Sequence, residues 1–498
     1  MKARLLFLSA LLLAGCMVGP DYRRPDPLPP GAPLPEGYKE VPPQGQAGEI
    51  PWKPAAPRDA QPRGKWWEIY GDSELNALEE KVTLNNQNIA AAEAQYRQAR
   101  AAVRVANSAL YPTVNFGPSL TNSRGSTTIG KGAADNSAPS NTVYNLPVQL
   151  TYVVDVWGQV RRQAEEGVAN AQNAAALLEN ARLSYQAELA QDWFSLHGSD
   201  SQIALLQDTI SSYEKYLVLT ENLYKSGVDS AQSVAQAKAQ LEQARVTLLD
   251  TQLARAQYEH AIAILVGVPP AQFALPAALL AGKPPALPPG VPAALLERRP
   301  DIAAQERSVA SANAAIGVAT AGYYPQINLN GSVGPQSSYA EKLFTWPSLV
   351  WSVGPSLLQP LYNAGLNHAQ VVQARAAYDA SVATYRQTVL TAFQQVEDDL
   401  VGLRFLEAEE TAEMKAVEAA NKSLQIATNA YKAGTQSYLD VIVAQNVALT
   451  NQQNAITIRN RRMNTSVLLI QALGGGWDAG QLPSRQEVST LPKEPAKP

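Results

Sequence analysis

The chain has little of the chemistry on which enzymes and metal sites depend. Its 498 residues include one cysteine and three histidines. Cys16 has no second cysteine with which to form a disulfide, and His197, His260 and His368 lack a nearby His, Cys or paired carboxylate at metal-ligand spacing. Neither a glycine-rich phosphate loop nor a nucleophile elbow is present. The sequence therefore predicts no enzyme, no metal site and no cofactor.

Charge and long apolar runs are also scarce. Charged residues make up 17% of the chain and the net charge is −4, so there is no basic surface of the kind that nucleic acid requires. After the first 16 residues, no apolar run approaches the length of about 18 residues that a membrane-spanning helix needs. Any crossing of a membrane must therefore be made by β-strands.

The first residues predict a secreted and lipidated chain. Lys2 and Arg4 precede an apolar run at residues 5–13, which is the pattern of a signal peptide. The segment Leu-Ala-Gly before Cys16 resembles the bacterial lipobox, which implies that residues 1–15 are removed and that Cys16 carries S-diacylglycerol and N-acyl groups. Together these groups contain three acyl chains, which anchor a protein firmly to a membrane leaflet. By the same resemblance, Met17 after the cysteine favours the outer membrane.

The most prominent feature of the sequence is an internal repeat. Residues 158–267 align on residues 365–474 without a gap, at an offset of 207. This places Tyr224 on Tyr431 and Gly227 on Gly434. A second match, residues 105–112 on residues 318–325, has an offset of 213. One supersecondary unit is therefore used twice.

Each unit contains long helices with a seam rich in alanine. Apolar and small residues recur at steps of three and four through residues 72–110, residues 158–226 and residues 365–433, which is typical of coiled coils. A break near residues 197–198 is one possibility. Shorter helices should return through residues 230–266 and 437–473, with Gly227, Gly434, Gly267 and Gly474 at the turns and stops. The helices alone fit either a cylinder of coiled coils or a simple long spacer.

Segments with a period of two favour the cylinder. In residues 143–156, apolar side chains and tyrosines alternate with polar ones, and residues 113–120, 326–333 and 346–357 show the same alternation. An apolar outside and a polar inside are typical of a membrane barrel strand, although a soluble β-sandwich also alternates. Four strands cannot close a pore, and unpaired edges are not tolerated in lipid. The barrel reading therefore requires several copies.

The chain resembles the TolC-like outer-membrane factors, in particular the lipid-anchored OprM and NodT branch. The matching motifs are Leu295-Leu296-Glu297-Arg298-Arg299-Pro300-Asp301-Ile302, Ala312-Asn313-Ala314, Tyr324-Pro325, Asp155-Val156-Trp157-Gly158-Gln159-Val160-Arg161 and Ala472-Leu473-Gly474-Gly475-Gly476-Trp477. The resemblance implies a mixed, mainly α fold: a homotrimer with a twelve-stranded outer-membrane β-barrel, continuous with a long periplasmic α-helical barrel. An equatorial region formed partly by the linker and the termini would surround its middle.

The expected organisation has six parts. They are the signal peptide at 1–15, a lipid anchor with a Pro-rich, extended tether at 16–65, the first repeat at 66–268, a Pro-rich linker at 269–300, the second repeat at 301–477, and a C-terminal tail at 478–498, which is polar after Gln481 and which we expect to be disordered from there on.

The resemblance also implies a function and its sites. Such a protein is the passive exit channel of a tripartite efflux system, joined through a periplasmic adaptor to an inner-membrane pump, here expected to be of the RND type. The periplasmic gate and the adaptor contact would lie at the helix tips, at Tyr224, Gly227, Ser230, Ser233, Tyr431, Gly434, Ser437 and Asp440. Three copies of Asp440 near the axis would attract cations. Ser233 and Val443 stand where relatives often carry Asp, so the constriction should be less acidic than theirs. The alternative is a trimeric coiled-coil lipoprotein that spaces the envelope layers without transport.

Overall fold

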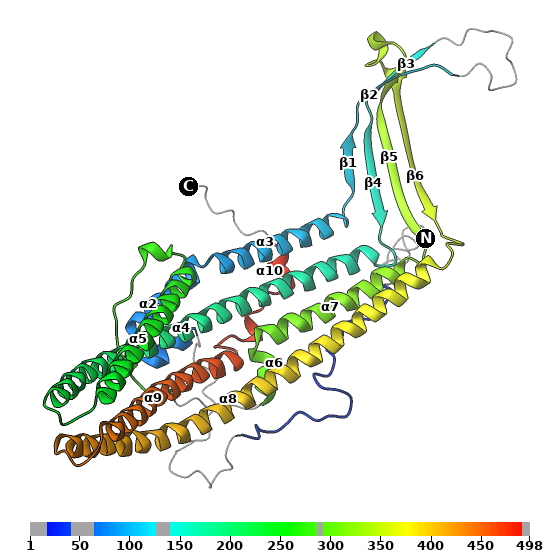
Figure 1. Cartoon of the computed structure of the whole chain (residues 1–498). Coiled ribbons are helices and arrows are strands. Elements are labelled where there is room, and N and C mark those ends of the chain that lie inside the picture. The colour runs from blue at the N-terminus through cyan, green and yellow to red at the C-terminus, as the bar shows by residue number, and fades with distance from the viewer. Residues whose placement is uncertain (1–16, 41–63, 126–139, 286–291, 491–498) are drawn as a thin grey trace.

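Two long helical hairpins lie side by side, and a narrow sheet stands at one end of them (Figure 1). The computed structural model describes residues 17–40, 64–125, 140–285 and 292–490. The predicted signal peptide and Cys16 lie outside the described residues, as do residues 41–63 of the predicted tether. Over the described ranges, no helix is both long enough and apolar enough to cross a membrane.

The elements follow one another in the same order in the two halves. The α-helices are α2 (Ser73–Asn85), α3 (Gln87–Ser108), α4 (Gln159–Lys225), α5 (Ala231–Leu265), α6 (Leu295–Arg298), α7 (Pro300–Ala321), α8 (Leu366–Lys432), α9 (Tyr438–Ala472) and α10 (Arg485–Ser489). The strands are β1 (Thr113–Phe116), β2 (Ser119–Ser123), β3 (Asn141–Asn145), β4 (Val148–Val154), β5 (Gln326–Ser337) and β6 (Leu349–Leu358). Short 3₁₀ turns occupy Trp66–Tyr70, Pro270–Gln272, Pro292–Ala294, Ala340–Lys342, Trp346–Ser348 and Ala479–Gln481.

The repeat seen in the sequence is a repeat of lengths as well. Helices α4 and α8 have 67 residues each, α5 and α9 have 35 each, and α3 and α7 have 22 each. The first two pairs keep the offset of 207, and the third keeps 213. At 1.5 Å per residue, α4 is about 100 Å long. It runs through His197 and Gly198 without interruption, so the break considered there does not occur.

The predicted continuous helix over residues 72–110 is wrong, because it is interrupted at Asn86. This residue has φ −64° and ψ 122°. Its side-chain oxygen accepts the backbone N–H groups of Asn88 and Ile89 at 2.9 and 3.1 Å, and its amide nitrogen donates to the carbonyl of Leu265 at 2.9 Å. Asn86 therefore caps α3 and ties it to the end of α5. The apolar stepping that predicted one helix continues across the break and so conceals it.

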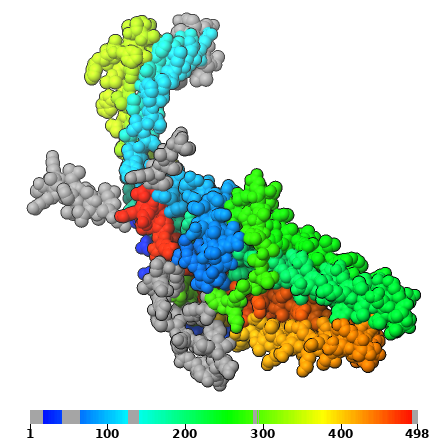
Figure 2. Space-filling model, turned by 90° about the vertical axis from the view of Figure 1, so that its left-hand side faces the viewer, coloured from blue at the N-terminus to red at the C-terminus, as the bar shows by residue number. Residues whose placement is uncertain are grey.

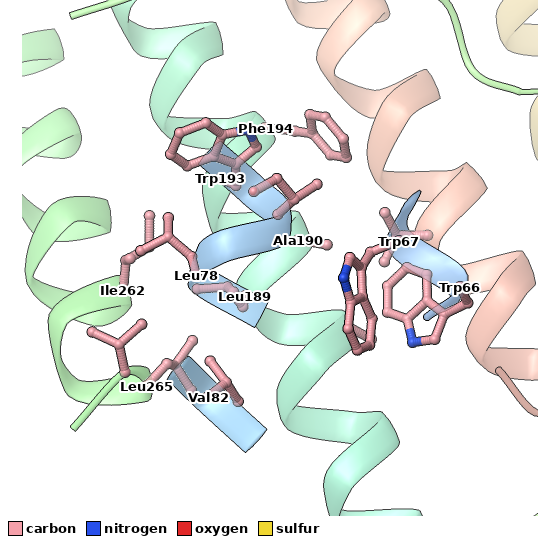
Figure 3. Packing of buried hydrophobic residues seen from close by; sticks show 14 of the residues in the cluster. Trp66, Trp67, Leu78, Val82, Leu189, Ala190, Trp193, Phe194, Ile262 and Leu265 are labelled. Atoms are coloured by element: carbon pink, nitrogen blue, oxygen red, sulfur yellow. The ribbon is translucent and has the colours of Figure 1, made fainter. Parts of the chain in front are cut away.

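The thickest core lies at the middle of α4, where α2 packs between the long helices (Figure 3). Trp66 and Trp67 precede α2 and are buried against α4, while Leu78 and Val82 of α2 face Ile262 of α5. Met463, Val467 and Ile470 of α9 close the cluster from the second repeat. This core holds the two repeats together at mid-length.

The N-terminal segment is extended, as expected, but residues 17–40 are docked on the helices and do not hang free. Leu28 and Tyr38 are buried against α7 and α8. The buried guanidinium of Arg162 in α4 bonds the carboxylate of Asp21 at 2.8 Å. The backbone N–H of Val18 donates to the carbonyl of Trp157 at 3.0 Å. Apolar contacts and these hydrogen bonds together fix this segment on the helices.

The expectation of a disordered C-terminal tail is wrong for residues 482–490. Val488 of α10 is fully buried with Val103 of α3 and Val168 of α4. Arg100 donates to the carbonyl of Glu487 at 2.9 Å. The burial of Val488 and the hydrogen bond from Arg100 together dock this part of the tail on α3 and α4.

The sheet consists in effect of four strands. β1 and β2 form the first, β3 and β4 the second, and β5 and β6 follow, all antiparallel. The predicted strand over residues 143–156 is interrupted at Leu146-Pro147, because Pro147 has no N–H for the ladder. The backbone N–H of Leu146 nevertheless reaches the carbonyl of Pro335 on β5 at 3.1 Å. The sheet therefore continues past the break.

Candidate functional site

The pairing register gives the sheet one apolar and one polar face. Directly opposed residues share a face, and most opposed pairs on the four strands sort by polarity; exceptions include Val153 opposite Asn328 and Leu358 opposite Gln326. The apolar face carries Val114 with Leu150, Phe116 with Val148, Tyr152 with Leu329, Val154 with Ile327, Val333 with Trp351 and Ile327 with Leu357. The polar face carries Asn115 with Gln149, Thr151 with Asn330, Ser332 with Ser352 and Asn328 with Ser356. This confirms the predicted alternation.

Exposed aromatic residues mark both ends of the sheet. Phe344 and Trp346 lie in the connection between β5 and β6, and Tyr111, Tyr323 and Tyr362 lie next to the helical end of the strands. The ten residues of β6 span about 33 Å. A strand of this length that is tilted by about 40°, as is usual in outer-membrane barrels, covers about 25 Å along the membrane normal. This equals the height of the apolar band of such barrels.

The opposite end of the molecule is formed by two matching helix turns. Gly227 and Gly434 have φ values of 76° and 72°, which only glycine adopts without strain. Gly227 N–H donates to the carbonyl of Tyr224 and Gly434 N–H to that of Tyr431. In each turn, the N–H of the residue after the glycine donates to the carbonyl of the residue before that tyrosine. The two bonds together form a Schellman motif. These glycines therefore end α4 and α8 as predicted from the sequence.

A hydrogen bond between side chains joins the two tips within the chain. The Tyr431 hydroxyl of α8 donates to the carboxylate of Asp229, in the first turn, at 2.8 Å and lies 3.3 Å from the hydroxyl of Thr220 in α4. The Tyr431 ring is buried and packs at 5.4 Å, centroid to centroid, on that of Tyr438. Burial, together with the nearby carboxylate, raises the pKa of Tyr431 to about 12. Tyr431 therefore remains a hydrogen-bond donor at any physiological pH.

Asp229 is the acceptor for three donors at the first tip. Partial burial acts to raise its pKa, but hydrogen bonds from the Ser233 hydroxyl at 2.6 Å, the Ser230 N–H at 2.7 Å and Tyr431 outweigh this effect and lower the pKa below its ordinary value. The carboxylate is thus ionised at neutral pH. A charged acceptor strengthens the bond from Tyr431.

Ser437 and Asp440 form the equivalent start of α9. The carboxylate of Asp440 accepts the backbone N–H of Ser437 at 3.2 Å and its hydroxyl at 3.0 Å. At the start of α5, the Ser230 hydroxyl accepts the N–H of Ser233 at 3.2 Å. Both serines therefore cap their helices, and the exposed Asp440 carries its charge at the tip surface.

The structure brings some of the predicted tip residues together and separates others. Ser230, Ser233 and Tyr431 meet at Asp229, whereas Tyr224 is 50% exposed although its repeat mate Tyr431 is only 5% exposed. Asp229 itself was missed by the sequence reasoning. The second repeat has Gln436 at the matching position, so Asp229 is not part of the pattern that the two repeats share.

The buried His197 is part of the helical core. Its Nδ1 lies 2.9 Å from the carbonyl oxygen of Ala278 and 3.3 Å from the carboxylate of Asp200, and its ring meets Trp193 edge to face. These contacts fasten the segment after α5 to α4. In the parts of the chain that the structure describes, there is no group of three or more His, Cys, Asp or Glu residues placed to hold a metal.

A two-faced sheet with aromatic ends, set on helical hairpins about 100 Å long, defines a class of protein: outer-membrane channels with a helical periplasmic part. The chain belongs to the outer membrane efflux protein family, whose model matches residues 78–268 and 291–475. It is an outer-membrane factor of the TolC and OprM type from a Gram-negative bacterium. The family consists of transport channels, and its function is that of an exit channel in tripartite efflux systems.

Relatives match over nearly their whole length. The Probable efflux pump outer membrane protein TtgC of Pseudomonas putida is 29% identical over 488 residues, which cover 97% of the chain and 98% of TtgC. The Probable outer membrane lipoprotein SilC of Salmonella typhimurium is 27% identical over 484 residues, or 96% of the chain and 99% of SilC. The solved structure of the outer-membrane channel OprN has a TM-score of 0.82 and 28% identity, and the match covers 93% of the chain and 100% of OprN. The resemblance and the mixed, mainly α fold with a helical part and a strand-rich end are confirmed, while the trimer and its closed barrel stay a prediction.

Proposed function

We propose that three copies of the chain form one duct that passively conducts small molecules out of the periplasm. The observation that carries this proposal is the two-faced sheet. The apolar face suits lipid, the polar face suits a water-filled lumen, and β1 and β6 each pair with one neighbour among the described strands. Edges left open in lipid are costly. Three sets of four strands close these edges in a twelve-stranded barrel.

The long hairpins would continue the lumen across the periplasm. An inner-membrane pump of the RND type would deliver cargo through a periplasmic adaptor, which would contact the exposed tip around Tyr224, Gly227 and Gly434. The polar face of the sheet is built largely of Ser, Thr, Asn and Gln side chains, which offer no shaped binding pocket. The choice of cargo therefore belongs to the pump, and the channel needs no cofactor of its own.

The lipid groups on Cys16 would anchor the duct where its sheet begins. Met17 contacts Gly158 at the start of α4, and a Cβ on that glycine would come within 2.7 Å of the Met17 side chain. The docked segment 17–24 therefore holds the residue after the proposed anchor beside the junction of sheet and helices, at the membrane surface. The name of the relative SilC, an outer membrane lipoprotein, supports this assignment.

The helix tips would form the gate. The bond from Tyr431 to Asp229 ties the second tip to the first, and opening requires tips to separate. The exposed Asp440 would contribute three charges near the axis and favour cations. An Asp440→Ala channel should show a weaker cation preference than wild type, and unchanged selectivity in a salt gradient would remove Asp440 from the conduction path.

Reconstitution of the purified protein in a planar lipid bilayer tests the proposed function directly. We expect discrete, cation-favouring currents from a preparation whose mass in detergent is that of three chains. The rival hypothesis, a trimeric lipoprotein that only spaces the envelope layers, predicts a trimer without current. To separate a closed gate from a missing channel, the same measurement is made on the Tyr431→Phe variant, in which the tips are loosened.

A further inference from the structure

A recess with a volume of about 410 Å³ lies where the end of α9 meets the start of α7, between α4 and α8. Its charged lining residues are Arg299, Asp301, Asp398 and Asp399, and the residues that α4 and α9 contribute to it are uncharged. Arg299 donates to the two carboxylate oxygens of Asp301 at 3.0 and 2.6 Å, and to the carbonyl of Ala472 at 2.9 Å. Carboxylates therefore outnumber cations within the recess, and the guanidinium is already engaged.

The N-terminal segment indicates which side of the helices the recess lies on. Glu397 of α8 accepts the backbone N–H of Glu40 at 3.1 Å, and Arg404 pairs with the carboxylate of Glu40 at 2.7 Å. Asp399 lies about 160° around α8 from Glu397 and about 140° from Arg404, at about 100° per residue. A segment that the lipid anchor proposed for Cys16 ties to the membrane runs along the outside of the duct. Asp399 therefore faces the lumen.

The first repeat places its own carboxylates in the same way. Asp192 is the repeat mate of Asp399, and each is the central residue of its 67-residue helix. Trp193 and His197 bind α2 and the segment after α5 on the covered side of α4. Glu188 lies about 140° around the helix from Trp193 and about 180° from His197, and it is exposed although both of its sequence neighbours are buried. Glu188, and Asp192 one turn further on, therefore face the uncovered side, which is the lumen.

We propose that Asp192 and Asp399 form a proton-controlled carboxyl belt in the lumen at the middle of the duct, and that the ionised belt strengthens the preference of the duct for cations. This inference rests on the trimeric duct of the proposed function, in which the belt consists of three copies of each aspartate. A ring of carboxylates attracts cations and resists anions. Solutes with a positive charge would therefore pass the belt more readily as it ionises.

A second carboxylate stands beside each aspartate, but not at matching positions. Glu188 has Gln395 as its repeat mate, and Asp398 has Gln191. The two carboxylate pairs are therefore not a simple result of the duplication.

Identified charged groups set the proton affinity of the two aspartates. Burial and the adjacent Asp398 raise the pKa of Asp399 to about 7, while Arg299 opposes this shift. Burial and Glu188 raise the pKa of Asp192 to about 7 as well. On the covered side of α4, the Trp193 indole holds the carboxylate of Asp72 from α2 at 2.9 Å.

The belt should therefore change its charge within the physiological range of pH. A carboxyl group with a pKa of about 7 is about one-tenth ionised at pH 6 and about nine-tenths ionised at pH 8. Two such groups in each of three chains add about five negative charges to the lumen over this range. Because the charge grows as pH rises, the preference for cations should be stronger at pH 8 than at pH 6.

Reversal potentials of the full-length protein in a planar bilayer, measured in a KCl gradient at pH 6 and pH 8, test the belt. The double variant Asp192→Asn with Asp399→Asn keeps the shape of the side chains and removes their charge. We expect it to resemble wild type at pH 6 and to lack the rise in cation preference at pH 8. The matched control is Glu397→Gln, which removes a carboxylate from the covered side of the same helix. If wild type is closed, all variants are made in the Tyr431→Phe background.

A thiol gives an independent measurement of where Asp399 lies. In Asp399→Cys, a positively charged methanethiosulfonate reagent that is added to the bath should lower the cation preference of an open channel. In Glu397→Cys, the same reagent should leave the current unchanged.

The possible results separate the belt from the duct itself. A cation preference that rises from pH 6 to pH 8 in wild type and in Glu397→Gln, but not in the double variant, supports the inference. A conducting wild type with equal preference at both pH values, or a double variant that keeps the rise, overturns the inference and leaves the exit channel standing. If the double variant does not assemble, an Asp399→Cys channel that the reagent does not affect overturns the inference. A trimer that conducts in none of these forms overturns the proposed function, and the belt with it.

Discussion

The bond between Tyr431 and Asp229 offers the sharpest test of how the tips are held. The substitution Tyr431→Phe removes the hydroxyl and keeps the ring, so the packing on Tyr438 is preserved. The lost bond is 2.8 Å long and ends on an ionised carboxylate. Asp229 retains the Ser230 N–H and the Ser233 hydroxyl as donors, so the substitution leaves no carboxylate unpartnered.

These contacts set the expected size of the effect. A hydrogen bond to a charged group contributes about 1.5–3 kcal/mol, and the lower value applies because Asp229 is partly exposed and keeps two donors. A loss of about 1.4 kcal/mol shifts the ratio of closed to open tips about tenfold for one copy. If the three tips of a trimer open together, the shift multiplies to roughly a thousandfold.

Single-channel recording in a planar bilayer measures this ratio as the fraction of time spent in the high-conductance state. The control is Tyr438→Phe, which removes a neighbouring hydroxyl from the same aromatic pair and should leave that fraction close to the wild-type value. Because the pKa of Asp229 is lowered, the carboxylate stays ionised above about pH 4. The stabilisation from the Tyr431–Asp229 bond is therefore present at neutral pH and is lost only when the pH falls low enough to protonate Asp229. The gain in opening that Tyr431→Phe causes should therefore be equal at pH 5 and pH 8.

Two results would refute this reasoning. One is a Tyr431→Phe channel that opens no more often than wild type although its trimer is intact. The other is an equal gain in opening for Tyr438→Phe, which would mean that the loss of either hydroxyl loosens the tips and that the bond to Asp229 has no particular role.

Three further predictions concern stability. Burial and a neighbouring carboxylate raise the pKa of the repeat mates Asp192 and Asp399 to about 7, so both groups stabilise the fold while protonated and that stabilisation is lost as pH rises through 7. The double variant Asp192→Asn and Asp399→Asn should flatten the fall in melting temperature between about pH 6 and pH 8, with about 1–2 kcal/mol at stake per site after solvent screening; a wild-type melting temperature that is constant over this range contradicts the assignment. Arg162→Met removes the buried guanidinium that holds the N-terminal segment. Its partner carboxylates, Asp21 and Glu165, are 90% and 33% exposed, so neither is left fully buried, and we expect a loss of about 1–2 kcal/mol together with new trypsin cleavage in residues 17–40. Protection of that segment as in wild type would show that apolar contacts alone dock it. Gly434→Ala should cost about 1 kcal/mol in the free energy of unfolding through its left-handed backbone, since no atom lies within 4 Å of the added Cβ; a loss in denaturant titration several times larger would reveal a contact at the tip that a single chain does not contain.

Periodicity and repetition made most of the fold predictable. The helix turns at Gly227 and Gly434 and the two faces of the sheet follow from patterns that extend over many residues, and the structure agrees with them. The features that the sequence concealed each depend on one residue with a distant partner. Asn86 caps a helix against α5, and Val488 fills a groove some 385 residues away in the chain from Val103.

The tip residues that both repeats share were the easiest to predict. Ser230 and Ser437 were found because each stands at the same place in its unit, and both cap a helix. Asp229 and Gln436 were not predicted as site residues because they differ between the repeats. That difference decides which of the two tips offers a carboxylate to a tyrosine hydroxyl. In a duplicated chain, conformation follows from what the halves share, and chemistry follows from what they do not.

The equal lengths of the paired helices limit how such a duct can be lengthened or shortened. One residue added to α4 would turn everything beyond it by about 100° and advance it by 1.5 Å, which would carry the seam off its neighbours. An insertion of about seven residues restores the seam, but the tip would still stand out of level unless α5, α8 and α9 received the same insertion. The change of offset from 213 to 207 lies between α3 and α4 in the first half and between α7 and α8 in the second, in the strands, where a length difference moves no tip. An engineer who wants a longer duct should therefore add whole heptads to all four helices at once, and can vary the strand connections freely.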